Sequence, residues 1–539
     1  MIPGLEYAPK VGDESIYERR LHGNERMTAA IAEHADGFGH IFDGTHVTFK
    51  TFIYRKDLLV AMKDAWIRTR FDAPWVATRT SPLQGPGEEP NSWKLSYETS
   101  PTGAEAARRW AEEIVIWREE SLSLEDWEEK LKDEFWKPSA GRFGMECHLA
   151  KAPGDGYFIM FSIAHWLADG RGILPSFDVF FKHLKAEIKG DYDSVDDLPW
   201  GEEIPRLSPS PVKALNVSTP DNTITGPPPP PPNVPVPFMR PVVEETDWAC
   251  RPSRKANISL SGEDTTALHR LCRSHKTNIT AVLNSIHIIA DVKTALRVSA
   301  ESVNFEQVLR AFDDSDVYPV YTNVADRRNL LLSHVPAVVA PAGFGSVVND
   351  NFPTFHDMKH IRNCINVSPM TRAIHSSLRK GNFWNGLAAE TQQFMRTNAQ
   401  STPDLYFLHE SAVDSAVASF DASMASIPGI MCSSVGNMTA LKLFDAFRPA
   451  TALPDPKSPF CIRDMSFAVR ASGVTAVVAM MWEYDGRLEI HLQSSPRYHS
   501  DEAWDIFVEE VKQAIAELLK ENPKSVGREM DHGKVQARL

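Results

Sequence analysis

The stretch His165-Trp166-Leu167-Ala168-Asp169-Gly170 places a histidine and an aspartate four residues apart, with a glycine directly behind them. The residues before it, 157–164, are apolar and β-prone, and an Asp155-Gly156 turn opens them. After the motif, apolar residues recur at helical spacing from Ile173 to Leu184. His165 is therefore predicted to lie where a buried strand ends and the chain turns into a helix. Such a place holds an imidazole rigidly while leaving one face open to a cleft.

The histidine of this motif is suited to proton transfer. A neutral imidazole with an ordinary pKa of about 6.5 accepts a proton near pH 7, so deprotonation of an acceptor hydroxyl or amine is the chemistry that the motif suggests. Two other interpretations exist. His165 and Asp169 could be metal ligands on one helical face, but no third ligand follows at metal-like spacing, and we expect no metal. His165 could also be a buried structural histidine that caps the loop.

The composition excludes several classes of partner. The chain has 539 residues, 42% hydrophobic and 24% charged, and its net charge of −14 argues against binding nucleic acid or an anionic membrane. It contains no apolar run of membrane-spanning length, and its N-terminus does not resemble a signal peptide. Six scattered cysteines without a C-x-x-C pair are typical of free thiols in a reducing compartment. We expect a soluble intracellular protein.

The last three residues refine that expectation. Ala537-Arg538-Leu539 is similar to the S-K-L class of peroxisomal import signal, and the residues before it are polar, as a receptor-read tail must be. Peroxisomal residence is therefore a hypothesis, with the cytoplasm as the other expected location.

A proline-rich segment divides the chain. Six consecutive prolines, Pro227 to Pro232, lie within residues 219–241 and favour an extended polyproline conformation. This segment could be a ligand for an SH3-type domain, but its mid-chain position favours a stiff crossover between two domains. We predict an N-terminal domain over 1–218 that carries the motif, a linker over 219–241, and a C-terminal domain over 242–539. Each part mixes strand and helix patterns, which indicates an α/β fold.

Several catalytic signatures are absent from the sequence. There is no G-x-G-x-x-G, no P-loop and no H-E-x-x-H. Cys432-Ser433-Ser434-Val435-Gly436 is similar to a nucleophile elbow, but a cysteine stands where the first glycine should be. A serine hydrolase is therefore not favoured.

The motif, its place after a strand and the two-domain length resemble the acyltransferase superfamily of H-x-x-x-D enzymes. This group includes plant BAHD acyltransferases, nonribosomal peptide condensation domains and fungal trichothecene O-acetyltransferases such as the 15-O-acetyltransferase-like enzymes. Weaker similarities occur at 271–283, 323–330, 342–345 and 433–437. Ala164 stands where condensation domains usually carry a second histidine, and the D-F-G-W-G loop of plant members is missing. Both departures favour the fungal O-acyltransferase branch.

The resemblance implies two chloramphenicol-acetyltransferase-like mixed-sheet domains with a channel between them. His165 would be the general base on an acceptor hydroxyl, without a covalent acyl-enzyme. Asp169 would point away from the channel and pair with an arginine, for which Arg327 is our first candidate and Arg328 our second. Gly170 would allow a tight turn beside the channel. Ser433 or Ser434 would supply a donor for the oxyanion, although both could equally be ordinary strand hydroxyls.

The function implied by the resemblance is an acyl-CoA-dependent O-acyltransferase of secondary metabolism. Its partners would be acyl-CoA as co-substrate and a small-molecule alcohol, with no permanently bound cofactor, and we expect a monomer. Two alternatives stay open: transfer from a carrier-protein thioester, as condensation-like domains perform, and a catalytically silent relative that only binds a metabolite. Retention of both His165 and Asp169 weighs against the silent relative.

Overall fold

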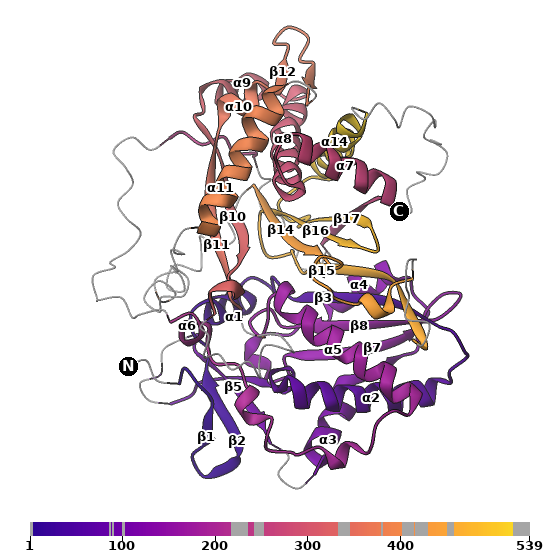
Figure 1. Ribbon diagram of the computed structural model, residues 1–539. Coiled ribbons are helices and arrows are strands. Elements are labelled where there is room, and N and C mark those ends of the chain that lie inside the picture. The colour runs from indigo at the N-terminus through magenta and orange to yellow at the C-terminus, as the bar shows by residue number, and fades with distance from the viewer. Residues whose placement is uncertain are drawn as a thin grey trace.

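The computed structural model has two parts that lie one above the other in Figure 1, each built on a β-sheet with helices packed against it. It describes residues 4–85, 88, 91–99, 103–216, 235–241, 253–331, 345, 347–378, 381–400, 414, 429–449 and 458–520. Both parts mix strands and helices, which confirms the predicted α/β class with mixed sheets.

A five-stranded sheet forms the centre of the N-terminal part. Its order is β15-β3-β8-β7-β6, with bounds Phe460–Val469, Ile41–Phe49, Tyr157–Ile163, Met145–Lys151 and Val115–Arg118. All seven residues of β8 are buried, as the apolar run before the motif predicted. Helices α2 (Arg55–Asp72) and α5 (Gly170–Lys189) pack against each other on one face of this sheet, and α4 (Leu124–Asp133) contacts β3 and β8.

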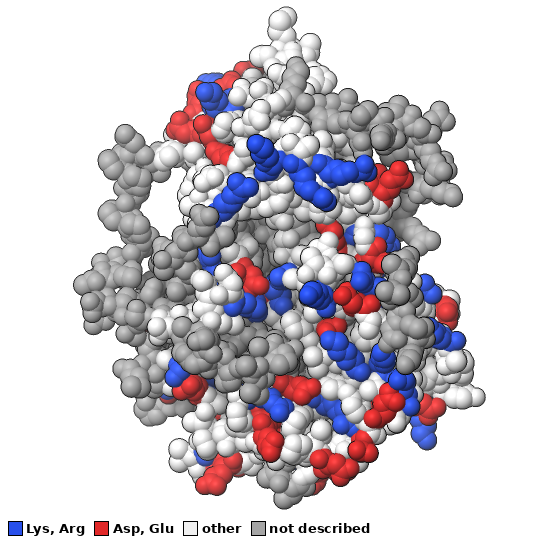
Figure 2. All heavy atoms as spheres, in the orientation of Figure 1, with Lys and Arg blue, Asp and Glu red and all other residues white. Residues whose placement is uncertain are grey.

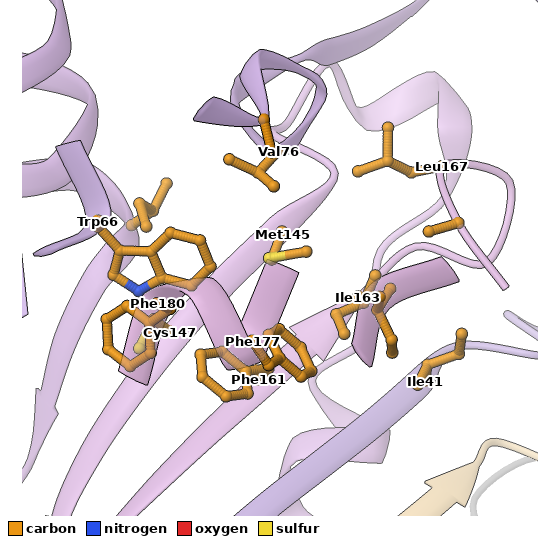
Figure 3. Packing of buried hydrophobic residues seen from close by; sticks show 14 of the residues in the cluster. Ile41, Trp66, Val76, Met145, Cys147, Phe161, Ile163, Leu167, Phe177 and Phe180 are labelled. Carbon is orange, nitrogen blue, oxygen red and sulfur yellow. The ribbon is translucent and has the colours of Figure 1, made fainter. Parts of the chain in front are cut away.

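Aromatic packing joins α2 and α5 to this sheet. The ring of Phe161 in β8 stacks on Phe177 of α5 with centroids 3.9 Å apart, and Phe180 stacks on Trp66 of α2 at 4.9 Å (Figure 3). Pairs of this kind add to the free energy gained from burying apolar surface. The helix that begins at the motif is therefore fixed rigidly against the strand that ends at it.

The remaining elements of the N-terminal part surround this core. A second sheet has the order β1-β2-β5-β4, with bounds Ala8–Lys10, Asp13–Arg20, Trp93–Glu98 and Arg79–Pro82. The remaining helices of the N-terminal part are α1 (Asn24–His34), α3 (Glu105–Ile114) and the short α6 (Pro211–Ala214).

The C-terminal part is built on a six-stranded mixed sheet. Its order is β11-β10-β14-β16-β17-β9, with bounds Asn349–Asp357, Val317–Asp326, Ile430–Asn437, Val477–Tyr484, Arg487–Ser494 and Arg254–Leu260. A small hairpin pairs β12 (Ile365–Val367) with β13 (Ile374–Ser376). The helices are α7 (Gly262–Ser274), α8 (Ile279–Ala300), α9 (Phe305–Asp314), α10 (Met358–Arg362), α11 (Ala388–Gln400) and α14 (Asp501–Leu519).

Helix α8 is the core helix of this part. It is the one helix among the described residues that is long and apolar enough to cross a membrane, but most of it is buried against α14, α11 and β14. Its apolar composition is therefore accounted for by packing inside the protein.

One strand crosses between the two parts. β15 comes late in the sequence, yet it pairs antiparallel with β3 and completes the N-terminal sheet. The six prolines of the linker lie outside the described residues. Its end, Pro235–Pro241, is described. Phe238 there is buried in the C-terminal core, and its amide donates to the carbonyl of Val317 at 2.8 Å. The predicted boundaries 1–218, 219–241 and 242–539 stay a prediction.

Candidate active site

The motif lies in a short connection between β8 and α5, as its sequence context predicted. β8 ends at Ile163 and α5 begins at Gly170. Asp169 is the N-cap of α5, with an extended backbone (φ −96°, ψ 166°). Its carboxylate accepts hydrogen bonds from the amides of Arg171 at 3.1 Å and Gly172 at 2.8 Å. An acidic N-cap satisfies amides that the helix leaves without partners, so Asp169 fixes the loop that carries His165.

His165 is half-buried at the start of this loop. Its Nδ1 atom is buried and has no hydrogen-bond partner among the described residues. Burial lowers the pKa of His165 below its usual value, and the backbone carbonyls of His165 and Ala168 and the charge of Asp169 oppose that shift. The imidazole is therefore neutral at pH 7, the state in which it accepts a proton.

A glycine packs against the edge of this ring. Gly39, which has a φ of +84°, lies so close that a Cβ there would be 3.2 Å from Cδ2 of His165. A side chain at position 39 would therefore push on the imidazole, and no pattern in the sequence indicates this contact.

The arginine that pairs with Asp169 is Arg328, and our first candidate, Arg327, is wrong for that pairing. Nη1 of Arg328 lies 2.9 Å from Oδ1 of Asp169, and both Nη1 and Nη2 donate to Oδ2 at 3.1 Å. Asp169 also accepts from the amide of Val348 at 3.2 Å. Arg327 is buried beside a cavity instead. The two neighbours point to different surroundings because the chain leaves β10 at Asp326 and turns into a short 3-10 helix at Arg328.

Arg171, in the first turn of α5, is a second arginine beside Asp169, and it contacts the C-terminal sheet. Nη1 of Arg171 donates to the carbonyl of Val435 in β14 at 2.8 Å, and its Nε lies 3.5 Å from Asp326. Asp326 in turn accepts from Arg328 at 3.0 Å. Asp169, Arg171, Asp326 and Arg328 thus form one charged network across the two parts, directly beside the motif. Sequence reasoning missed Arg171 and Asp326, because nothing in the local pattern distinguishes them from surface charges.

Gly436 makes room for this network. Its φ is +108°, and a Cβ there would lie 2.4 Å from Nη1 of Arg171. Only glycine combines this backbone with such a close approach. Glycine at position 436 therefore avoids both a strained backbone and a shift of the Arg171 guanidinium away from β14.

Gly170 does not have the role that we expected. It is the first residue of α5 and has no positive φ, so the turn does not need a glycine there. The extended backbone of Asp169 makes the turn instead. A Cβ on Gly170 would meet no atom within 4 Å among the described residues.

A cavity of about 170 Å³ has Asp326, a member of this network, in its lining. It is lined by side chains from α8, the end of β10, α11 and β14, including Thr280, Asn284, Arg327 and Ser434. Of the two serines that we considered as oxyanion donors, Ser434 lines this cavity, and Ser433 is the preceding residue of β14. The oxyanion role of either serine stays a prediction.

Cys432 also lines the cavity, but its thiol is not activated. Burial raises its pKa to about 12, and the neighbouring His287, whose Nδ1 lies 3.8 Å from the sulfur, has a pKa lowered by burial to about 4. Both groups are neutral at pH 7, whereas a cysteine nucleophile needs a thiolate. Within the described ranges, no group of three or more His, Cys, Asp or Glu side chains is placed to hold a metal ion.

Comparisons with known proteins agree with this architecture. No family model matches the sequence. No curated protein matches it either. Among solved structures, the TRI3 trichothecene 15-O-acetyltransferase from Fusarium sporotrichioides is 13% identical, with a TM-score of 0.69 over 96% of this chain and 99% of that one. The condensation domain of the monacolin K polyketide synthase MokA is 12% identical, with a TM-score of 0.55 over 94% and 98% of the two chains.

Polyketide synthase associated protein 5 from Mycobacterium tuberculosis is 13% identical, with a TM-score of 0.53 over 94% of this chain and 98% of that one. At these identities the likeness is one of fold, and it extends over nearly the whole length of each protein. The chain therefore shares the mixed-sheet α/β fold of these three proteins, in two parts.

Proposed function

We propose that this protein is an acyl-CoA-dependent O-acyltransferase that esterifies a hydroxyl group of a small metabolite. The observation that carries the proposal is the state of His165: a neutral, half-buried imidazole on a loop fixed by Asp169. The likeness to an acetyltransferase and to a condensation domain supports acyl transfer as the reaction class.

In the proposed reaction His165 accepts the proton of the acceptor hydroxyl through Nε2, and the oxygen attacks the thioester carbonyl. The tetrahedral intermediate collapses as the carbon–sulfur bond breaks. The thiolate takes the proton back from the imidazolium, so the products are an ester and a free thiol, and His165 is neutral again. Asp169 acts through the loop and does not touch the reacting atoms, because its carboxylate is occupied by Arg328 and three backbone amides.

The alternative donor is a carrier-protein thioester, since condensation domains share the fold. The other alternative is a silent relative that only binds a metabolite. The intact geometry of the Asp169 cap favours a working site over a silent one, because a silent site would not need a positioned base.

The test is incubation of the purified protein with a panel of acyl-CoAs and candidate alcohols, with detection of free thiol and mass analysis of the products. Alcohol-dependent thiol release together with an ester product supports the proposal. Binding of alcohols without thiol release from any acyl-CoA would contradict it and would favour one of the two alternatives.

A further inference from the structure

Four exposed cations lie together on the C-terminal part, and we call them the basic stripe: Arg270, Arg273, Lys276 and Arg396. None of the four makes an ion pair or a side-chain hydrogen bond with the part of the chain that the structure describes, whereas exposed arginines such as Arg108 and Arg109 pair with carboxylates. Figure 2 shows Lys and Arg side chains gathered in a row over the region of α7 and α11. In a chain with a net charge of −14, such a row is a local site of attraction for anions.

The stripe lies on elements that are fixed to one another. Arg270 and Arg273 are about one turn apart on the exposed face of α7, and Lys276 follows its end. The connection from α7 to α8 is bound to α11, because the amide of Asn278 donates to Oε1 of Gln392 at 2.8 Å. Arg396 follows Gln392 by four residues on α11 and so lies on the same side of that helix. The four charges therefore have a common and rigid support.

The cavity beside Asp326 opens next to this stripe. Thr280, in the first turn of α8, lines it, and so does Met395, the residue before Arg396. Asp326 lines it as well and belongs to the network on Asp169. Asn284, which is 4% exposed and also lines the cavity, has a buried Oδ1 with no hydrogen-bond partner among the described residues. A buried amide oxygen without a partner needs an N–H or O–H donor, which a ligand in this cavity would supply.

We propose that the basic stripe binds the phosphate groups of the acyl-CoA donor, and that the cavity receives its amide-bearing pantetheine arm. This assignment rests on the proposed function and names the anionic end of its donor. Guanidinium and ammonium groups are the side chains that recognise phosphate. An N–H of the arm would donate to Oδ1 of Asn284, and the thioester would point toward Asp326 and the network at the motif.

The surroundings of the stripe favour a small polyphosphate ligand over an acidic carrier protein. A docked protein of ordinary size buries about 800 Å² on each partner, with an apolar centre. No large hydrophobic side chain of α7, α8 or α11 is among the exposed ones in the described ranges, and the exposed Val324 of β10 lines the cavity and is not part of the stripe. Charges without an apolar centre suit the phosphates of a nucleotide.

The experiment compares two donors that differ in phosphate content. Arg270→Glu/Arg273→Glu reverses two charges of the stripe. Lys512→Glu/Lys520→Glu is the control for total charge, because Lys512 is exposed on α14 and Lys520 is exposed at its C-cap. Calorimetry measures the Kd of CoA and of pantetheine, which lacks the nucleotide and its phosphates, for each protein. The stripe variant should bind CoA about tenfold more weakly, with binding of pantetheine unchanged, and the control should bind both like the wild type.

Kinetics with acetyl-CoA and acetyl-pantetheine add a second readout. The stripe variant should raise KM for acetyl-CoA only, leave kcat unchanged, and lose most of the salt dependence of KM. Equal Kd values of variant and wild type for CoA would overturn the stripe assignment, while transfer by the wild type would leave the proposed function intact. CoA binding without transfer to any alcohol would contradict the proposed function alone. Binding of an acidic phosphopantetheinylated carrier protein, with no binding of CoA, would overturn the choice of CoA.

Discussion

The carboxylate of Asp169 and the guanidinium of Arg328 join the two parts of the molecule at the motif, with Nη1 and Oδ1 2.9 Å apart. Both side chains are largely buried, at 5% and 17% exposed. A buried ion pair is strongly destabilising when one member is removed, because the other is left without compensation. The contact therefore holds the loop of His165 against the C-terminal sheet.

The pairing predicts an asymmetry between two neighbouring arginines. Asp169→Ala and Arg328→Ala should each lower the melting temperature, and the double variant should lose less than the sum, with a coupling free energy of about 1–3 kcal/mol. The matched cycle of Asp169→Ala with Arg327→Ala should show much weaker coupling. Thermal melts of the five proteins and the wild type measure both cycles. Equal coupling in the two cycles would contradict the assignment of Arg328.

Gly436→Ala should disturb the contact between β14 and α5. The new Cβ would strain a backbone with φ +108° and would displace Arg171 from the carbonyl of Val435. We expect a loss of about 2–4 kcal/mol in the free energy of unfolding, together with slower transfer. Gly486→Ala is the matched control, because Gly486 has a φ of +75° and its Cβ would meet no described atom within 4 Å. Equal losses in the two variants would show that the displacement of Arg171 does not lower the free energy of unfolding.

Asp43 makes stability depend on pH. It is fully buried in β3, neither carboxylate oxygen has a hydrogen-bond partner among the described residues, and burial raises its pKa well above the usual value. Above about pH 4 the folded state therefore keeps a proton that the unfolded state has released. The contribution of Asp43 to stability falls as pH rises from the unfolded pKa of about 4 to the raised pKa of the folded state.

Asp43→Asn removes this titration. The stability of the variant relative to the wild type should therefore improve between pH 5 and pH 8, by up to about 1.4 kcal/mol for each pH unit below the raised pKa. Parallel melts of the two proteins at pH 5, 6.5 and 8 measure the effect. A difference that does not change with pH would mean that Asp43 is ionised in the folded protein.

The chain end gives a prediction that is independent of the fold. Ala537-Arg538-Leu539 lies outside the described residues. Deleting it should leave transfer in vitro unchanged and should move an N-terminally tagged protein from punctate organelles to the cytosol. Diffuse fluorescence from the intact protein in a host with peroxisomes would show that the tripeptide is not an import signal.

The sequence predicted the local elements of the site better than the contacts between them. The strand before His165 and the helix after Asp169 could be predicted because a continuous apolar, β-prone run precedes the motif and apolar residues at helical spacing follow it. The choice between Arg327 and Arg328 could not, because a shift of one residue at the end of β10 reverses the direction of the side chain. The contact of Arg171 with Val435 spans 264 residues, and the pairing of β15 with β3 joins opposite ends of the chain, so both depend on tertiary structure.

The central claim is that His165 is the base of acyl transfer, and the most direct measurement is the rate of ester formation by His165→Ala across pH. The truncation leaves the Asp169 network untouched, so the variant should melt like the wild type while its transfer rate falls by at least a hundredfold. In the wild type, kcat/KM should fall as pH drops through a pKa below the usual 6.5, since burial lowers the pKa of His165 and only the neutral ring accepts the proton. A folded His165→Ala variant that keeps more than a tenth of wild-type turnover would contradict the account.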